Sequence, residues 1–116
     1  MQVSKVKEFG MTYTLIDFWA DWCLPCKRMA PIIDRAVHQF ENLTLDKVDA
    51  DKPENEQLLR DYDVRSIPTL VLINDDGEII SAIVGTHTEA QLLQWLDSEM
   101  NRDDDLQEIK EEAIIE

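Results

Sequence analysis

The sequence predicts an α/β fold in which a central mixed β-sheet is flanked by helices. Segments of strand character alternate with segments of helical periodicity, and a hairpin signal joins the last two strands. Parallel βαβ units followed by a hairpin indicate a sheet that is partly parallel and partly antiparallel. At 116 residues the chain is long enough for one compact domain and too short for two ordinary ones.

The first half of the pattern is a strand and a helix that meet at the segment "FWADWCLPCKRMAP". The preceding segment "TYTLIDFWA" (residues 12–20) is β-branched and aromatic without helical periodicity, which predicts a strand buried on both faces. From Pro25 to about Phe40, apolar residues recur at helical spacing and predict an amphipathic helix. Pro31 removes one backbone donor inside this helix, so we expect a kink there.

The second half supplies the remaining elements. Residues 43–51 and 69–73 have strand character, and residues 54–62 read as a short helix between them. The hairpin signal "NDDG" (residues 74–77) precedes an antiparallel strand over residues 78–84. Thr88 and Gln91 form a capping box that opens a last helix, whose buried side carries Leu92, Leu93, Leu96 and Met100.

The chain is strongly acidic, with a formal net charge of −14. Phosphate backbones and anionic lipids would repel it, so we do not expect direct binding to nucleic acid or membranes. The N-terminal segment lacks the apolar stretch that follows the basic residues of a signal peptide. No apolar stretch in the sequence approaches the length of a membrane span. We therefore expect the protein to be cytoplasmic. Structural disulfides are rare in that compartment.

Cys23 and Cys26 are the only two cysteines in the chain, and their role has three interpretations. A structural disulfide across two residues would close too small a loop to restrict the unfolded chain much. A tetrahedral metal site needs about four ligands, and only His38 and His87 are soft candidates beside the cysteines. We therefore favour a reactive dithiol and expect no metal.

The position of the pair favours reaction at Cys23. A strand, then Cys-x-x-Cys, then a helix places Cys23 at a helix N-terminus, where backbone N–H groups and the helix dipole stabilise a thiolate. Cys23 would be the nucleophile, and Cys26 one turn away would resolve the adduct.

At these residues the sequence resembles the thioredoxin family. "DFWADWCLPCKRMAP" looks like the active-site stretch of that family, "VRSIPT" (residues 64–69) resembles its substrate-loop motif, and "VG" (residues 84–85) falls where the family has its late glycine. The resemblance covers about residues 12–100. It implies a thioredoxin-like fold and a thiol–disulfide oxidoreductase that reduces protein disulfides, with thioredoxin reductase as electron donor and no bound cofactor.

Asp17 and Lys47 are the candidates for proton transfer. Asp17 lies in the middle of an apolar strand, where desolvation would raise the pKa of its carboxyl group; a solvent-facing edge position is the alternative. The resemblance implies that Asp17 deprotonates Cys26 through water and that the amine of Lys47 tunes this acid, although Lys47 could equally be a solvated strand lysine.

The resemblance also implies a substrate surface around the cysteines. Pro68 matches the cis-proline of the family, and the backbone of Ile67 would pair with an extended substrate segment. Trp22, which flanks the nucleophile, would shape this surface. The remaining expected substrate-binding residues are Leu24, Pro25 and Gly85. We expect His38 to be solvated and assign no role to His87.

The chain departs from the family in three places. Leu24 stands where thioredoxins usually carry glycine, which leaves the reduction potential open and would enlarge the apolar contact surface. Only about eleven residues precede Thr12, so we expect a shortened N-terminus with one short strand or helix over residues 3–9.

The third departure is an acidic C-terminal extension. We expect a thioredoxin-like domain over residues 1–102 and an extension over residues 103–116. In the extension a helix would begin at "DDD" and bury a stripe of Leu106, Ile109, Ala113 and Ile114 over surface exposed by the shortened N-terminus. A frayed, solvated tail is the alternative.

Two other functions stay open at this point. One is a more oxidising disulfide oxidase or isomerase, and the other is a thioredoxin-like binding subunit of a larger assembly that does not use thiol chemistry. The reductant, acting as a monomer on disulfide-containing proteins, is the function that the residues favour.

Overall fold

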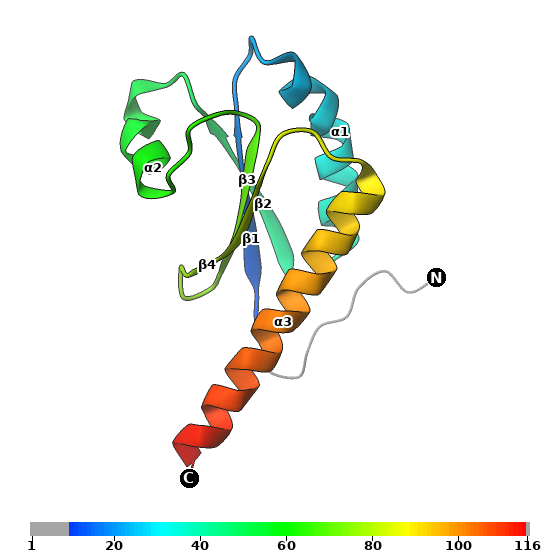
Figure 1. Ribbon diagram of the computed structural model, residues 1–116, viewed down its shortest axis with the longest axis vertical. Coiled ribbons are helices and arrows are strands. Elements are labelled where there is room, and N and C mark those ends of the chain that lie inside the picture. Colours follow the sequence, from blue (N-terminus) through cyan, green and yellow to red (C-terminus); the bar gives the residue numbers. More distant parts are fainter. Residues whose placement is uncertain (1–9, 116) are drawn as a thin grey trace.

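A computed structural model of the chain describes residues 10–115, with side chains for residues 10–110. In chain order the elements are β1 (Tyr13–Trp19), α1 (Leu24–His38), β2 (Leu43–Asp49), the 3₁₀ turn η1 (Pro53–Asn55), α2 (Glu56–Asp61), β3 (Thr69–Asn74), β4 (Ile79–Val84) and α3 (Glu89–Ile115). This order confirms the predicted alternation. In Figure 1, α1 and α3 lie on one side of the sheet and α2 lies on the other.

The four described strands form one mixed sheet in the order β2-β1-β3-β4. β1 pairs parallel with β2 and antiparallel with β3, and the hairpin adds β4 antiparallel to β3. The two central strands, β1 and β3, are buried along most of their length. Their continuous apolar sequence follows from this position, because a strand covered on both faces has no solvent side to alternate with.

The two sides of the sheet pack against separate cores. The larger core lies under α1 and α3, where Leu15 and Leu72 from the sheet meet Met29 and Leu96 from the helices. The smaller core lies under α2 and contains Ile16, Phe18, Val48 and Val71. Phe18 contacts the ring of Tyr62 here, with the ring centroids 6.0 Å apart. Both cores hold β1 in place, and β1 leads directly into the cysteine motif.

The predicted helix boundaries are largely confirmed. The Thr88 amide donates to Oε1 of Gln91 at 2.9 Å and the Gln91 amide donates to Oγ1 of Thr88 at 3.1 Å, which is the reciprocal capping box expected at the start of α3. Pro31 lies inside α1, which runs on to His38. The kink at Pro31 stays a prediction.

The C-terminal extension differs from the expected one. α3 is continuous from Glu89 to Ile115, so no helix begins at "DDD" and the boundary expected at residues 102/103 falls inside α3. Asp103 and Asp104 are buried, whereas Leu106 and Ile109 are exposed, so the expected buried apolar stripe is wrong. The side chains of Ala113 and Ile114 lie outside those described.

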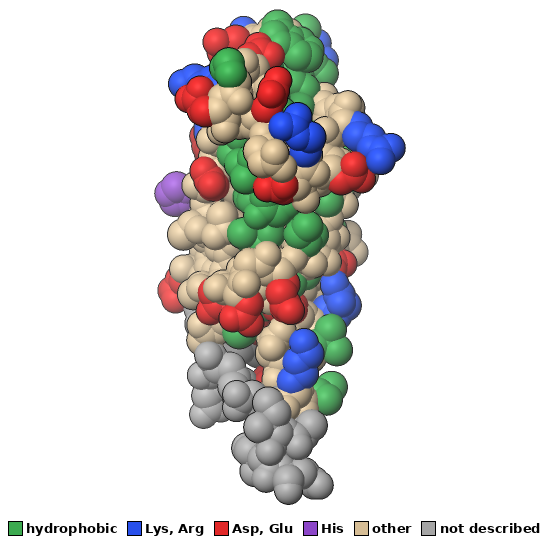
Figure 2. Space-filling view, turned by 90° about the vertical axis from the view of Figure 1, so that its left-hand side faces the viewer, with side chains coloured by type: hydrophobic (Ala, Val, Ile, Leu, Met, Phe, Trp, Pro, Cys, Tyr) green, Lys and Arg blue, Asp and Glu red, His purple; other side chains and the backbone are tan. Residues whose placement is uncertain are grey.

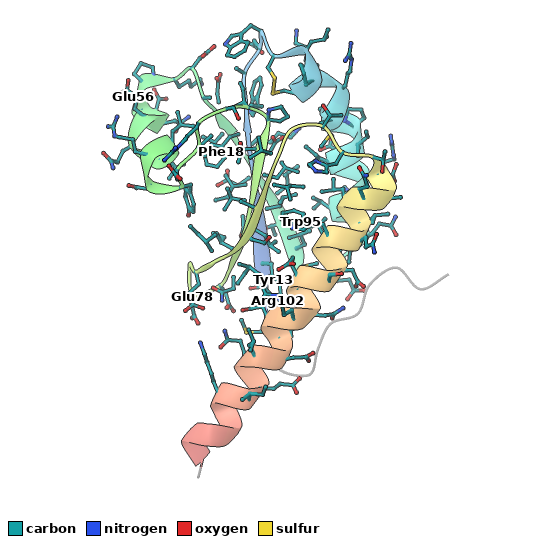
Figure 3. The ribbon with its side chains drawn as sticks, in the orientation of Figure 1. Tyr13, Phe18, Glu56, Glu78, Trp95 and Arg102 are labelled. Atoms are coloured by element: carbon teal, nitrogen blue, oxygen red, sulfur yellow. A yellow bond between two sulfur atoms is a disulfide. The ribbon has the colours of Figure 1, made fainter. Side chains whose placement is uncertain are left out.

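The physical reason is a contact with the start of β1. The Tyr13 hydroxyl reaches both carboxylates, and this contact turns the acidic side of α3 towards the sheet. Figure 3 shows Tyr13 beside α3. The expected strand or helix over residues 3–9 lies outside the described residues. Among the helices described for residues 10–115, none is long and apolar enough to cross a membrane.

Candidate active site

The two cysteines lie where β1 has ended and α1 begins, and they form a disulfide. Cys23 is the N-cap residue of α1, and its Sγ accepts a hydrogen bond from the Cys26 amide at 3.2 Å. The Cys23 amide donates to the carbonyl oxygen of Ala20 at 3.1 Å, which fixes the turn between strand and helix. The expected position of Cys23 at a helix N-terminus is confirmed. A thiolate released by reduction would face the unpaired amides and positive dipole end of α1.

The disulfide is buried but its neighbours are not. Cys23 and Cys26 are both buried, whereas Trp22 and Leu24 on either side of Cys23 are exposed and Pro25 is half-buried. A partner that docks on Trp22 and Leu24 therefore comes directly onto Cys23.

Asp17 lies in the middle of β1, on the side of the sheet that α1 covers, and only 4% of it is exposed. Burial raises the pKa of its carboxyl group to about 6, while the charge of Lys47 lowers that pKa and the charge of Asp34 adds to the rise. The burial expected from the apolar strand is therefore confirmed, and the edge position is excluded. A carboxyl group with this pKa exchanges protons close to neutral pH.

A cavity of about 180 Å³ joins this acid to the cysteine pair. Its lining is formed by Asp17, Trp19, Asp21, Cys26, Lys27, Ala30 and Lys47. The volume suits several water molecules, since one water needs only about 10–15 Å³ of such space, and the Asp17 carboxyl group and the Lys47 amine supply polar partners in a lining that is otherwise mainly apolar. Asp17 and Cys26 thus share a space in which water can carry a proton between them.

Lys47 lies beside Asp17 in the sheet, because these two residues are register partners in β1 and β2. Its Nζ atom is 3.5 Å from Oδ1 of Asp34, and both of these side chains are about half exposed. Lys47 therefore does two things at once: it forms a surface ion pair with α1, and its charge acts on the buried Asp17 carboxyl group.

The loop before β3 faces the cysteines from the opposite side. The Ile67–Pro68 peptide bond is cis, as the resemblance implied. Ile67 packs against Ala20, Cys23 and Cys26. The Gly85 amide donates to the carbonyl oxygen of Pro68 at 2.9 Å, and Gly85 takes a φ of 92°, a left-handed conformation that favours glycine. Between the described residues no hydrogen bond engages the amide or carbonyl of Ile67.

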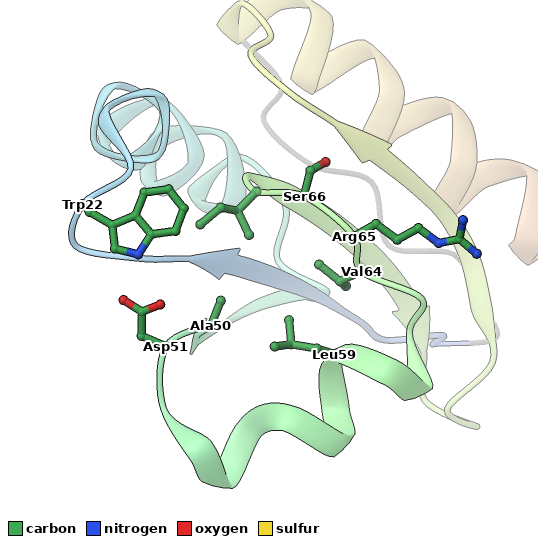
Figure 4. Close-up of a pocket in the computed structure, with 8 residues that line it drawn as sticks. Trp22, Ala50, Asp51, Leu59, Val64, Arg65 and Ser66 are labelled. Atoms are coloured by element: carbon green, nitrogen blue, oxygen red, sulfur yellow. The ribbon is translucent and has the colours of Figure 1, made fainter.

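A second cavity, of about 400 Å³, opens between Trp22 and this loop. Trp22, Ile67 and Ser66 border it on the cysteine side, and Ala50, Asp51, Leu59, Val64 and Arg65 complete the lining. Figure 4 shows Asp51 and Ala50 below the Trp22 ring, with the Arg65 guanidinium extending away from it. Ala50, Asp51 and Leu59 carry no sequence signal that marks them as site residues. Trp22 and Ile67 were expected at this surface from the family resemblance, and residues 64–66 belong to the substrate-loop motif.

The two histidines stay outside this chemistry. His38 is exposed on α1, as expected, and its ring Nδ1 is 3.1 Å from the carbonyl oxygen of Asp34. His87 is half-buried, with its amide donating to Sδ of Met29 at 3.4 Å and its ring Nδ1 3.1 Å from the Gly85 carbonyl oxygen.

Known proteins share this arrangement. The family model for thioredoxin matches residues 3–98 of the chain. The chain belongs to the thioredoxin family. A thioredoxin of Mycolicibacterium smegmatis is 43% identical over 83 residues, which are 71% of this chain and 73% of that protein. A thioredoxin of Buchnera aphidicola is 36% identical over 91 residues, or 78% of this chain and 82% of that protein.

Solved thioredoxin structures agree with the fold. A mutant thioredoxin from Halobacterium salinarum is 32% identical and matches 84% of this chain and 88% of its own, with a TM-score of 0.68. Thioredoxin-2 of the malaria parasite, described as a component of a protein secretion machinery, matches with a TM-score of 0.67 at 26% identity and covers 76% of this chain and 84% of its own.

Family and site together give the activity. The thioredoxin family and the Cys23–Cys26 disulfide make this chain a thiol–disulfide oxidoreductase that reduces protein disulfides. Thioredoxins work in general on disulfide-containing proteins and receive electrons from a thioredoxin reductase.

Proposed function

We propose that the chain is a monomeric cytoplasmic reductant in which Cys23 attacks the target and Cys26 completes the reaction. The observation that carries this assignment is the place of the pair: Cys23 caps α1, whereas Cys26 lines the cavity that holds Asp17. The α1 N-terminus favours the thiolate at Cys23. The proton acceptor therefore lies on the side of the second cysteine.

The reaction transfers two electrons from the dithiol to the target. The Cys23 thiolate attacks one sulfur of the target disulfide, forms a mixed disulfide and releases the other target sulfur as a thiolate, which takes a proton from water. Cys26 then loses its proton and attacks Sγ of Cys23. This second step breaks the mixed disulfide, releases the second target thiolate and forms the Cys23–Cys26 disulfide. No bound cofactor takes part.

Asp17 is the base for Cys26 in this proposal. Its carboxyl group is buried, has a pKa of about 6, and faces the same cavity as Cys26, so water in that cavity can pass the proton from thiol to carboxylate. Lys47 tunes the acid, because its charge opposes the rise of the Asp17 pKa that burial causes.

The target docks on the rim of the disulfide, in which Trp22 and Leu24 are exposed and Pro68 is buried. Trp22, Leu24 and Pro25 form one side of this rim and Ile67, Pro68 and Gly85 the other. The Ile67 backbone makes no hydrogen bond to any residue that the structure describes, so its amide and carbonyl are available to pair with an extended target segment. A thioredoxin reductase returns the electrons.

Trapping of the intermediate tests the order of the two cysteines. With insulin as the target, Cys26→Ser should accumulate a mixed disulfide at Cys23 that mass spectrometry detects, while Cys23→Ser should form none. A mixed disulfide that accumulates on Cys26 in the Cys23→Ser protein, at the wild-type rate, would reverse the assignment.

The role of Asp17 has its own test. Asp17→Asn should slow the release of the target from the mixed disulfide by about 100-fold, the lower end of the usual contribution of a general base. The first attack by Cys23 should keep its rate. The apparent pKa near 6 in the pH profile of the release step should disappear with the carboxyl group. If both steps slow equally, Asp17 acts only on the structure.

The reduction potential decides between reductant and oxidant. Equilibration against a dithiothreitol series should give a value near the thioredoxin range of about −270 mV. A value near −180 to −120 mV, roughly the range of disulfide isomerases and strong oxidants, would overturn the proposed direction of electron flow.

A further inference from the structure

The helices of the described chain cover the two sides of the sheet unequally. α1 has 15 residues and α3 has 27, and both lie on the side of the larger core. The other side carries α2, with 6 residues, and the three-residue turn η1. α2 lies over one end of the sheet (Figure 1), so the other end of this side has no described helix over it.

Apolar side chains are exposed on this second side. The register pairs Ile79 with Ile73, Ala82 with Val71 and Val84 with Thr69, which places these residues on the side of the smaller core. Ile79, Ala82 and Val84 are exposed and Ile73 is half-buried. We call the surface formed by Ile73, Ile79, Ala82 and Val84 the open face. Figure 2 views the molecule from this side, with hydrophobic side chains along its middle.

Acidic side chains gather at the hairpin end of the open face. Asp75, Asp76 and Glu78 lie exposed in the hairpin that leads into β4, whereas Arg102 and Lys110 of α3 line a pocket with Ile79 beside them. Figure 2 shows acidic side chains beside the hydrophobic strip, with basic ones among them. The chain as a whole carries a net charge of −14. An apolar face with these hairpin acids at one end, on a chain of this net charge, is complementary to a segment that is apolar on one side and basic on the other.

We propose that the open face binds an amphipathic, basic helix of a partner protein. The exposed apolar groups lie on a face of the sheet and not along its edge. Helices cover sheet faces of this kind, as α1 and α3 cover the other side of this sheet. β4 has six residues and spans about 20 Å at roughly 3.3 Å per residue, which a helix of about 13 residues matches. A second copy of the chain would bring another net charge of −14 against the first.

The Ile79 end of the open face is separate from the thiol chemistry, whereas Val84 lies next to Gly85 at the other end. Ile79 begins β4, whereas Gly85, which contacts the substrate loop, follows its other end. A partner that binds at Ile79 therefore docks at a distance from the disulfide. This binding can be measured independently of the thiol reaction.

Two synthetic peptides test the proposal. One is a 14-residue amphipathic helix of leucine and lysine, and the other has glutamate in place of every lysine. Titrated into the full ¹⁵N-labelled chain, the lysine peptide should shift the amide resonances of β4 and Ile73, and its Kd should rise at least tenfold between 50 and 500 mM NaCl. The glutamate peptide should cause no shift. Equal binding of both peptides, or binding of neither, would overturn the proposal.

A matched pair of variants separates the open face from general attraction to an acidic protein. Ile79 is 53% exposed on the open face and Ile109 is 61% exposed on α3, so lysine at either position costs little buried surface. Ile79→Lys should weaken the lysine peptide at least tenfold, Ile109→Lys should leave its Kd within twofold, and both should reduce insulin at the wild-type rate. Equal loss in both variants, or shifts confined to α3, would contradict the proposal.

Other occupants give different results in the same experiment. If residues 1–9 of the chain fill the open face, deleting them should strengthen peptide binding more than tenfold. If a second copy fills it, the free protein should sediment as a dimer that Ile79→Lys dissociates. Either result would replace the partner helix as the occupant.

Discussion

The hydroxyl of Tyr13 lies 2.6 Å from Oδ1 of Asp104, which joins the start of the central strand β1 to the last helix, α3. The same hydroxyl is 3.1 Å from Oδ2 of Asp103 and 3.1 Å from the carbonyl oxygen of Met100. Burial and the two carboxylates, Asp104 foremost, raise the pKa of Tyr13 far above its ordinary value, so the hydroxyl keeps its proton and donates it. One buried donor thus serves several acceptors at the base of the sheet.

Removing this donor should destabilise the fold. Tyr13→Phe leaves the ring in the core but removes a buried hydrogen bond to charged acceptors, which typically contributes about 1.5–3 kcal/mol. Urea unfolding of the oxidised protein measures the loss. Tyr62→Phe is the matched control: Tyr62 is half-buried, and its hydroxyl makes no hydrogen bond to the residues described here, so its loss should stay within about 0.5 kcal/mol. Equal losses would show that the Tyr13 hydroxyl contributes nothing specific.

Truncation of the C-terminal extension should give a graded result. Deleting residues 103–116 removes both carboxylates that Tyr13 contacts and should lower the melting temperature. Deleting residues 108–116 keeps Asp103 and Asp104 and removes Ile109, whose exposed side chain contributes little to the core. Thermal unfolding followed by circular dichroism compares the two proteins. An unchanged melting temperature after the longer deletion would contradict a structural role for the extension.

The order of the elements could be predicted because each has a local signal. The apolar run around Asp17, the helical spacing after Pro25 and the capping box at Thr88 all depend on residues close together in the sequence. The burial of Asp104 could not be predicted in this way, since its partner Tyr13 is 91 positions away. Three consecutive aspartates are typical of an exposed helix start. Only the tertiary contact with Tyr13 shows that two of them are buried within a longer helix.

The features of the site also differ in whether residues close together in the sequence predict them. The reactivity of Cys23 and the burial of Asp17 follow from spacing and strand pattern, and the structure confirms both positions. The cis bond before Pro68 came from family resemblance, because nothing local distinguishes it from a trans bond. The cavity beside Trp22 unites Ala50, Leu59 and Val64 from segments whose proximity depends on how α2 packs.

The buried Asp17 should make stability depend on pH in a defined direction. Its pKa is about 6 in the folded protein and near 3.8 when exposed, so between these values the folded state binds more protons than the unfolded state. The free energy of unfolding should therefore fall as the pH rises from about 4 to about 6. Above about pH 6 the contribution of Asp17 should stay constant. The difference between the two pKa values corresponds to roughly 3 kcal/mol.

Asp17→Asn tests that direction. The variant should be more stable than wild type at pH 7 by on the order of 3 kcal/mol, and the advantage should vanish near pH 4, where the wild-type carboxyl group is protonated. Urea unfolding of the oxidised proteins at several pH values measures this. Asp46→Asn, at an exposed position in β2, should change stability by less than about 0.5 kcal/mol at every pH. A destabilised Asp17→Asn protein at pH 7 would contradict the desolvation of the carboxylate.

Leu24 should act on the affinity for protein targets and not on the chemistry. Its side chain is exposed beside Cys23 and stands on the first turn of α1, so it can cover apolar surface of a docked protein without altering the N-terminal amides that face Cys23. Burying part of a leucine side chain contributes about 1 kcal/mol, or roughly a fivefold change in affinity. Leu24→Ser should therefore raise KM for insulin about fivefold with kcat unchanged. Reduction of a small disulfide such as that of oxidised glutathione, which is too small to reach across Leu24 and Trp22 together, should keep its rate. Equal losses with insulin and with the small disulfide would place the effect of Leu24 in the redox chemistry of the cysteine pair.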